Sequence, residues 1–171
     1  MSFMKQFKNK LILGISSFYH DSGASLVKNG KILSAVQEER FTRIKHDNSF
    51  PQNSIDYCLS ENNLKIEDID EIVFYEDPKL KMDRILKTFI SNSPRNFGLF
   101  SKAFVSQYKK WKQLKKEIPN LQFIKHHESH AASAFYPSPF KEAVIVTLDG
   151  VGEWDTASVS VGIGNKLKMI Q

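Results

Sequence analysis

The amino-acid sequence predicts an α/β protein with a mixed five-stranded sheet, followed by the beginning of a duplicated copy. Short apolar runs, typical of buried strands, alternate with segments whose apolar residues recur every three or four positions, as in helices. In addition, a strand, a polar loop and a hairpin at residues 11–36 return in the same order at residues 144–169. We therefore expect a first lobe over residues 1–140 and the start of a second lobe over residues 141–171.

The predicted strands of the first lobe begin with the apolar run at residues 11–17. After a polar loop, Asn29-Gly30 separates two further apolar runs. Asn-Gly in this setting is the strongest short-range hairpin signal, because both residues accept positive φ values. Residues 72–75 and 121–124 are also short apolar runs and complete the five expected strands.

Helices are predicted between and after these strands. Pro51 suits the first turn of a helix. The apolar face of that helix contains Ile55, Cys58 and Leu59. A second helix is expected over residues 127–136, since Pro137 and Pro139 follow it and neither continues a helix.

The segment at residues 79–117 is strongly basic, with 11 Lys/Arg and 2 Asp/Glu, whereas the whole chain has a net charge of +5. Two helices separated near Pro94 are expected there. The second carries an apolar stripe at helical spacing: Phe97, Phe100, Phe104, Tyr108, Trp111 and Leu114. Such charge suits nucleic acid or acidic lipid. A stripe that packs in the core, with lysines facing water, explains the pattern more simply, so we do not expect nucleic-acid binding.

Composition adds an expected location. The chain has one cysteine, Cys58, so no internal disulfide forms. This fits a reducing compartment. No apolar run approaches the roughly 20 residues that span a bilayer. The first residues show neither an apolar core nor a small-residue cleavage site, so we expect no signal peptide and a cytoplasmic protein without a membrane partner.

Two histidines and an aspartate form the most informative motif. His126 and His130 lie four residues apart, on one face of the predicted helix. Asp149 follows an apolar run and precedes Gly150. Two imidazoles and a carboxylate suit iron, manganese or zinc. From the spacing alone, a histidine that caps or packs the helix and an aspartate that only shapes a turn explain the residues as well. His127 points about 100° away from His126 on a helix, so we expect it either to orient a metal ligand or to have a structural role.

The repeat suggests a superfamily. Two lobes that each begin with a three-stranded meander are typical of the actin-like, sugar-kinase-like and Hsp70-like ATPases, which share a ribonuclease H-like fold. In that superfamily the first loops of the two lobes hold phosphates. Gly150, Val151 and Gly152 suit this role, because glycines let backbone N–H groups approach an anion closely. The alternative is that they are turn residues only.

With the repeat and the histidine motif in hand, the chain resembles the N-terminal region of the O-carbamoyltransferases, which include nodulation-factor and antibiotic-tailoring enzymes. The resemblance covers nearly the whole chain outside the basic helices. The matching stretches are residues 12–15, 20–24, 38–46, 51–55, 126–140 and 147–154.

The resemblance implies an activity. Members of this family join a lobe pair like that of the tRNA threonylcarbamoyl-transferring enzymes to a C-terminal YrdC-like domain. That domain makes carbamoyl-adenylate from carbamoyl phosphate and ATP. The lobe pair transfers the carbamoyl group to a small-molecule hydroxyl with the help of a bound metal, expected to be iron. The resemblance implies His126, His130 and Asp149 as ligands. A later aspartate ligand of the family has no counterpart here. Because adenylate synthesis and half of the cleft would be absent, we expect the chain alone to be inactive.

The resemblance also suggests roles for residues of the first lobe. His20 and Asp21 lie in its first loop, where His20 would deprotonate the acceptor hydroxyl. A cluster after the third strand would hold the anionic adenylate: Arg40, Arg43, Lys45 and His46. The alternatives are hydrogen bonds within the loop for the first pair and a solvated surface for the cluster.

Two other functions remain open from the sequence. A different phosphotransferase or ATPase of the same superfamily would hydrolyse nucleotide without carbamoyl phosphate. A non-catalytic basic module would bind nucleic acid with an affinity that falls steeply with salt, and would be indifferent to His130→Ala. An oligomer is compatible with either of these and with the carbamoyltransferase.

Overall fold

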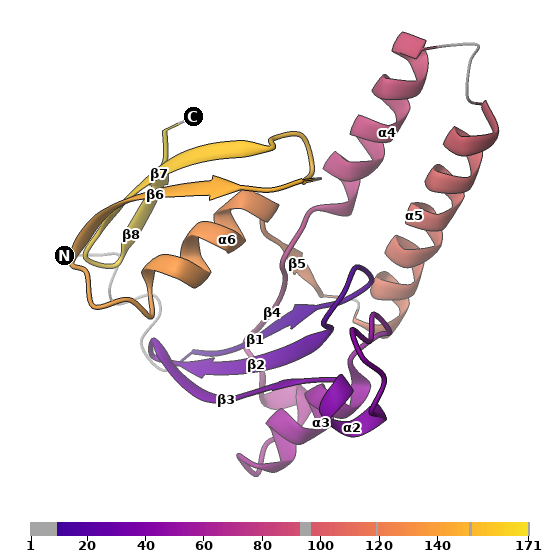
Figure 1. The fold of residues 1–171 in the computed structure, drawn as a ribbon. Coiled ribbons are helices and arrows are strands. Elements are labelled where there is room, and N and C mark those ends of the chain that lie inside the picture. Colours follow the sequence, from indigo (N-terminus) through magenta and orange to yellow (C-terminus); the bar gives the residue numbers. More distant parts are fainter. Residues whose placement is uncertain (1–9, 93–96, 119, 151, 171) are drawn as a thin grey trace. The chain divides into compact units, whose positions relative to one another are not determined.

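The structure is a computed structural model that describes residues 10–92, 97–118, 120–150 and 152–170 (Figure 1). The chain divides into two compact units. The first unit consists of Met1–Phe74 and Leu114–Gln122, and the second consists of Tyr75–Gln113 and Phe123–Gln171.

A mixed five-stranded sheet forms the body of the first unit, as the sequence predicts. Its strands are β1 (Leu11–Ser16), β2 (Gly23–Lys28), β3 (Lys31–Gln37), β4 (Glu71–Phe74) and β5 (Gln122–Phe123), in the order β3-β2-β1-β4-β5. The first three strands form an antiparallel meander, and β4 runs parallel to β1. The predicted hairpin turn is confirmed, because Asn29 and Gly30 have φ values of 54° and 76°.

Helix α3 (Gln52–Ser60) packs on β2 and β3 through its predicted apolar face. Ile55, Cys58 and Leu59 are buried there. The start of α3 is held by Glu38, which lies between β3 and the short helix α2 (Glu39–Thr42). The buried Glu38 carboxylate accepts hydrogen bonds from the backbone N–H of Ser54 at 2.9 Å and from the Ser54 hydroxyl at 2.7 Å. A remote side chain thus satisfies a donor that the first turn of a helix leaves without a partner. A short 3-10 helix, Ile66–Asp68, precedes β4.

Helices α4 (Pro78–Asn92) and α5 (Phe97–Glu117) occupy the basic segment. Pro94, near which the two helices are expected to separate, lies outside the described residues. Burial of the whole apolar stripe of α5 was a wrong prediction, because Phe97 is 65% exposed and Tyr108 is 44% exposed. The stripe contacts Phe89 of α4 through Phe100, with ring centroids 4.1 Å apart, and through Phe97, with ring centroids 5.8 Å apart. Leu114, near the end of the stripe, is buried.

The second unit contains a second antiparallel meander. Its strands are β6 (Glu142–Leu148), β7 (Ala157–Ile163) and β8 (Lys166–Met169), in the order β6-β7-β8. Helix α6 (His126–Phe135) packs on one face of this sheet, where the Phe135 ring lies against Gly162. A Cβ atom at Gly162 would lie 2.5 Å from the ring, so this approach requires glycine. The predicted repeat therefore consists of two antiparallel meanders.

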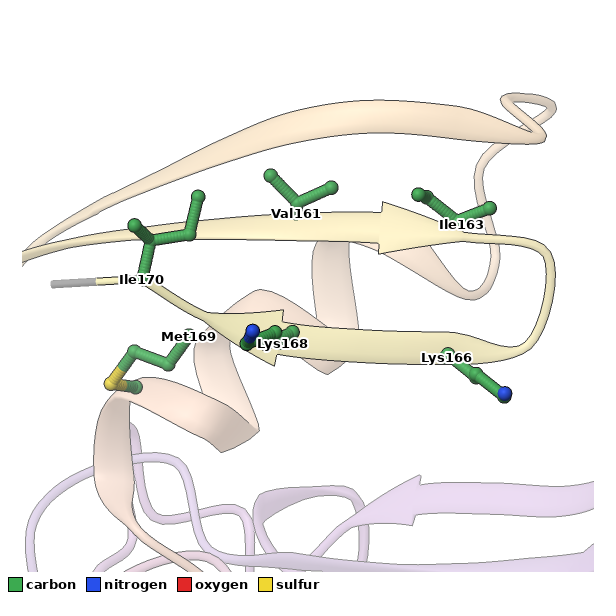
Figure 2. Close-up of a pocket in the computed structure, with 6 residues that line it drawn as sticks. All are labelled: Val161, Ile163, Lys166, Lys168, Met169 and Ile170. Carbon is green, nitrogen blue, oxygen red and sulfur yellow. The ribbon is translucent and has the colours of Figure 1, made fainter. Parts of the chain in front are cut away.

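The opposite face of the second meander is apolar and exposed. Side chains alternate between the faces of a strand, and Val144, Val146 and Leu148 of β6 are 68%, 62% and 78% exposed on this face. Figure 2 shows a shallow hollow on the neighbouring strands, lined by Val161, Ile163, Lys166, Lys168, Met169 and Ile170. No helix of the described part of the chain is both long and apolar enough to cross a membrane.

Candidate metal centre

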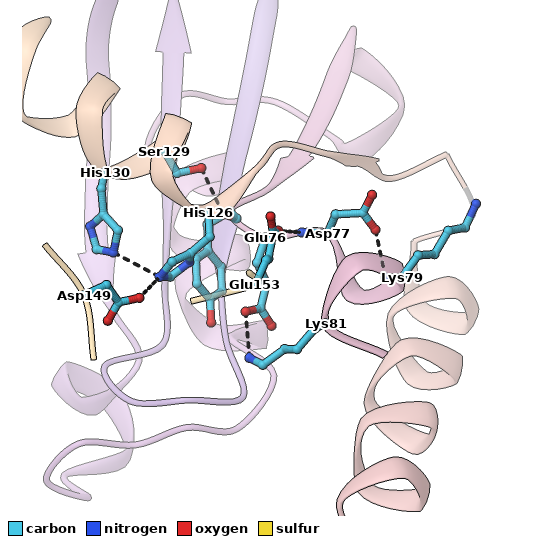
Figure 3. Close-up of polar contacts among 10 residues, drawn as sticks. Glu76, Asp77, Lys79, Lys81, His126, Ser129, His130, Asp149 and Glu153 are labelled. Carbon is cyan, nitrogen blue, oxygen red and sulfur yellow. Dashed lines mark hydrogen bonds and ion pairs between the residues drawn. The ribbon is translucent and has the colours of Figure 1, made fainter. Parts of the chain in front are cut away.

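Helix α6 places two imidazoles side by side. His126 is the first residue of the helix, and His130 lies one turn later. Their ring centroids are 4.5 Å apart and their Nε2 atoms 3.1 Å apart (Figure 3). Side chains at positions i and i+4 share a helix face, so the predicted spacing brings both nitrogens to one point.

Asp149 reaches the same point from the sheet. It directly follows β6, and its backbone N–H donates to the Thr156 carbonyl at 2.8 Å, which closes the loop between β6 and β7. The Asp149 Oδ2 atom lies 2.8 Å from His126 Nε2. One ligand atom from each of His126, His130 and Asp149 can be chosen so that all three lie within 4.8 Å of one another. The structure therefore gathers the three residues named as metal ligands from the sequence.

The spacing of these donors fits a metal ion. Two ligand atoms that are each about 2.1 Å from a shared ion, at angles of about 90–110°, lie roughly 3.0–3.4 Å apart. The measured separations of 2.8 Å and 3.1 Å are close to this range. Two imidazole nitrogens with one carboxylate suit iron, manganese or zinc and leave coordination positions open.

The surroundings of His126 favour its neutral form. Burial lowers the pKa of His126, the neighbouring His130 lowers it further, and the charge of Asp149 opposes both effects. Its side chain is only 12% exposed. A neutral imidazole offers a nitrogen lone pair to a metal, so this site keeps His126 in the binding form near neutral pH. The Tyr75 ring packs edge-on against the His126 ring, with ring centroids 5.5 Å apart.

His127 lies outside the donor group, in agreement with either role expected for it. Its ring is buried, and Nδ1 lies 2.9 Å from the Ser158 hydroxyl. Gly152 lies beside this ring. A Cβ atom at Gly152 would lie 2.7 Å from the Asp155 carbonyl oxygen and 3.3 Å from both His127 Nε2 and Asp149 Oδ2. Glycine therefore lets the loop that carries Asp149 pass close to α6.

The residues named in the first loop belong to the first unit and contact one another. Asp21 Oδ2 lies 2.8 Å from His20 Nδ1, and Asp21 Oδ1 lies 3.0 Å from His46 Nδ1. The hydrogen bond to His46, followed by that to His20, lowers the pKa of Asp21. Asp21 and His46 both have positive φ values, 51° and 56°. Such backbone conformations are uncommon outside glycine and are often found at functional sites.

The remaining residues named for anion binding make few contacts with other described residues or are exposed. Arg40 is exposed and pairs with Glu39 at 2.8 Å, and Lys45 is exposed. Gly150 has open space around its Cα atom. Val151 lies outside the described residues.

Comparison with known proteins gives the family. A family model described as Carbamoyltransferase N-terminus matches residues 11–171, almost the entire chain. The chain belongs to this carbamoyltransferase family.

Several relatives align with most of this carbamoyltransferase region. The nodulation protein NolNO of Sinorhizobium fredii is 34% identical over 154 residues, which cover 90% of this chain and 23% of that protein. The uncharacterized protein sll1178 of Synechocystis is 48% identical over 175 residues, or 91% of this chain and 28% of that protein. The uncharacterized protein MJ1051 of Methanocaldococcus jannaschii is 33% identical over 162 residues, which cover 94% of this chain and 26% of that protein. The chain thus spans about a quarter of the length of these relatives.

Sequence reasoning missed two buried carboxylates that lie near the donor group. Glu153 and Glu76 are buried in the second unit, near the donor group (Figure 3). Glu76 pairs with Lys81 at 2.8 Å. Glu153 lies four residues after Asp149, in one of the stretches that resemble the family. This position was the one feature of the sequence that could have marked Glu153 as a candidate site residue.

Proposed function

We propose that this region is the N-terminal part of an ATP-dependent O-carbamoyltransferase. The enzyme would move a carbamoyl group from carbamoyl phosphate, through carbamoyl-adenylate, to a hydroxyl group of a small molecule. The observation that carries the proposal is the convergence of His126, His130 and Asp149 in a chain of the carbamoyltransferase family. The two similar meanders support the actin-like, duplicated fold proposed for the lobes.

The proposed ligands are His126, His130 and Asp149, and the proposed metal is iron, with manganese or zinc as alternatives. A metal bound there supplies a Lewis acid for the oxygen of the carbamoyl group. His126 contributes a neutral imidazole, because its burial disfavours protonation. Asp149 contributes a negative charge that partly balances the positive charge of the ion.

In the first unit, we propose His20 as the base that takes the proton of the acceptor hydroxyl. The contact between His20 Nδ1 and Asp21 orients the ring and leaves Nε2 to receive that proton. Asp21 stays ionised, because its hydrogen bonds to His46 and His20 lower its pKa. We propose that Arg40, Lys45 and the 150–152 loop bind the anionic part of the adenylate.

The proposal implies partners and a location. The YrdC-like domain expected from the family would supply carbamoyl-adenylate, and the acceptor would be a small molecule with a free hydroxyl. The single buried thiol, Cys58, supports a reducing cytoplasm as the location.

The test uses the complete protein that contains this region. Carbamoyl-phosphate-dependent exchange of pyrophosphate into ATP would report adenylate formation, and AMP release with a panel of sugar and oligosaccharide acceptors would report transfer. We expect His130→Ala to abolish acceptor-dependent AMP release and to leave the exchange intact. Ser133→Ala, an exposed position on the same helix, is the matched control. Transfer at the parental rate in His130→Ala would contradict the proposal.

A further inference from the structure

His127 forms a buried hydrogen bond between helix α6 and the second meander. Its Nδ1 atom and the Ser158 hydroxyl lie 2.9 Å apart, and both residues are only 3% exposed. Ser158 lies in β7, one of the strands that α6 contacts. A hydroxyl both donates and accepts, so this hydrogen bond forms with either tautomer of a neutral imidazole. The contact holds the first turn of α6 on the sheet.

The strand that carries Ser158 also positions the third donor. Ser158 pairs with Thr147 of β6 in the antiparallel register, and Asp149 directly follows β6. The backbone N–H of Asp149 then donates to the Thr156 carbonyl of the neighbouring chain segment at 2.8 Å. The strand pair β6–β7 therefore receives the first turn of α6 at Ser158 and presents Asp149 at its end.

These contacts close a ring around the donor group. His127 directly follows His126 in α6. Asp149 Oδ2 lies 2.8 Å from His126 Nε2, and the rings of His127 and His130 have centroids 6.3 Å apart. A rotation or shift of the first turn of α6 would change the distance from His127 to Ser158 and would also move His126 relative to Asp149. The buried hydrogen bond therefore opposes the motions that would separate the donors.

Stability alone does not explain a histidine at this position. The Nε2 atom of His127 is buried and has no hydrogen-bond partner among the described residues. A buried polar atom without a partner lowers stability. A Cβ atom at Gly152 would lie only 3.3 Å from this Nε2, so the loop after Asp149 passes close to the ring. An apolar side chain would fill the same space without an unpaired nitrogen, but it would lose the contact with Ser158.

We propose that His127 is a positioning residue of the metal centre, whose hydrogen bond to Ser158 keeps His126 beside Asp149. The inference rests on the proposed metal centre. It differs from a purely stabilising contact between a helix and a sheet, because it links a side chain outside the donor group to the affinity for the metal.

Phe135 provides a matched control at the other end of the same helix. It is buried, and its ring packs on Gly162 of β7. Phe135→Leu should weaken the packing of α6 on the meander without removing the hydrogen bond that holds the first turn. We expect this variant to be less stable than the parent and to bind metal with the parental affinity.

The experiment is a titration of the complete, metal-free protein with Co²⁺, followed by its visible absorption spectrum. His130→Ala should remove this spectrum, which assigns it to the site. An asparagine amide occupies the place of Nδ1 of a histidine, whereas a glutamine amide occupies that of Nε2. We therefore expect His127→Gln to weaken Co²⁺ binding roughly 10–100-fold, the range typical when a residue that orients a ligand is removed. His127→Asn should retain most of the affinity.

Ser158→Ala removes the same hydrogen bond from the side of the sheet. It should cause a loss of affinity similar to that of His127→Gln. The double variant should lose little more than either single variant, because both substitutions remove one shared contact. All titrations are made at a temperature where circular dichroism shows the variants folded.

Parental Co²⁺ affinity in His127→Gln and Ser158→Ala would overturn the inference and leave the metal centre standing. An equal loss in Phe135→Leu would also overturn it, because any loosening of α6 would then suffice. If the parent protein bound no Co²⁺, the metal centre itself would be contradicted, and this inference with it. If His127→Gln does not fold, Ser158→Ala decides the matter alone, since it removes only one hydroxyl group.

Discussion

The two meanders follow the same path but are completed differently. In each, three antiparallel strands are joined by one longer loop and one tight turn, and a glycine with positive φ lies in the turn, Gly30 in the first and Gly164 in the second. The first meander is extended by β4 and β5 and covered by α3. The second carries α6 on one face, and its opposite face exposes apolar side chains in the described part of the chain.

The longer loops differ as well. Asp21 of the first loop contacts His20 and His46, and both imidazoles are exposed. Asp149 of the second loop contacts His126, which is only 12% exposed and begins a helix. The repeated strands therefore supply a common scaffold. The side chains that contact the aspartate of each loop from outside the repeat make the two loops chemically different.

Apolar side chains of the two meanders should differ in their contribution to stability. Leu13 of β1 is fully buried, whereas Leu148 of β6 is 78% exposed. Leu13→Ala should lower the free energy of unfolding by about 2–5 kcal/mol, since it leaves a cavity. Leu148→Ala should change it by less than about 0.5 kcal/mol. Urea denaturation of both variants checks the pair, and equal losses would mean that the exposed face is buried in solution.

Removing the helix cap of the first meander should have the next largest effect. Glu38 holds the start of α3 through Asn53 and Ser54. Glu38→Ala should lower the free energy of unfolding by roughly 1–3 kcal/mol, because buried donors lose their acceptor. Thermal unfolding followed by circular dichroism measures this loss. An unchanged midpoint would show that water replaces the carboxylate without cost.

Two strand glycines should tolerate alanine differently. A Cβ atom at Gly162 would overlap the Phe135 ring at 2.5 Å, whereas at Gly14 it would meet the Ser25 hydroxyl at 3.1 Å. Overpacking a tight site costs about 1–3 kcal/mol, so Gly162→Ala should destabilise by this amount and Gly14→Ala by less. Chemical denaturation of both proteins decides the order, and the reverse order would mean that α6 does not pack on the second meander as described.

Acid should weaken the first unit through Asp47, a smaller effect than the others. The hydrogen bond from the Ser49 side chain, followed by that from Thr42, lowers the pKa of Asp47 below its usual 3.8. The unfolded chain therefore binds this proton more readily, so the stabilisation is present above about pH 3.8 and is lost as the pH falls through the lower folded-state pKa. Asp47→Asn should flatten the fall in stability between pH 5 and pH 2, as measured by urea midpoints. An unchanged slope would exclude Asp47 as a source of acid sensitivity.

Local patterns in the sequence were enough to find the strands, the Asn29-Gly30 turn and the buried face of α3. They also placed His126 and His130 on one helix face and Asp149 at the end of a strand, and the family resemblance strengthened the interpretation of these residues as metal ligands. The contacts of Glu38 and Glu153 could not be found this way, because each carboxylate accepts from a backbone N–H group at the start of a helix that is distant in the sequence. The exposure of Phe97 was missed for a related reason, since a helical stripe shows which face is apolar and not how much of it a partner covers.

We propose that the second meander, and not the first, carries the metal centre. The most direct test measures the metal content of protein purified without a metal-affinity tag, for the parent, Asp149→Asn with His130→Ala, and Asp21→Asn with His46→Ala. We expect close to one metal ion per chain in the parent and in the first-loop variant, and almost none in the second-loop variant. Metal retained after both second-loop substitutions, or lost after both first-loop substitutions, would contradict the claim.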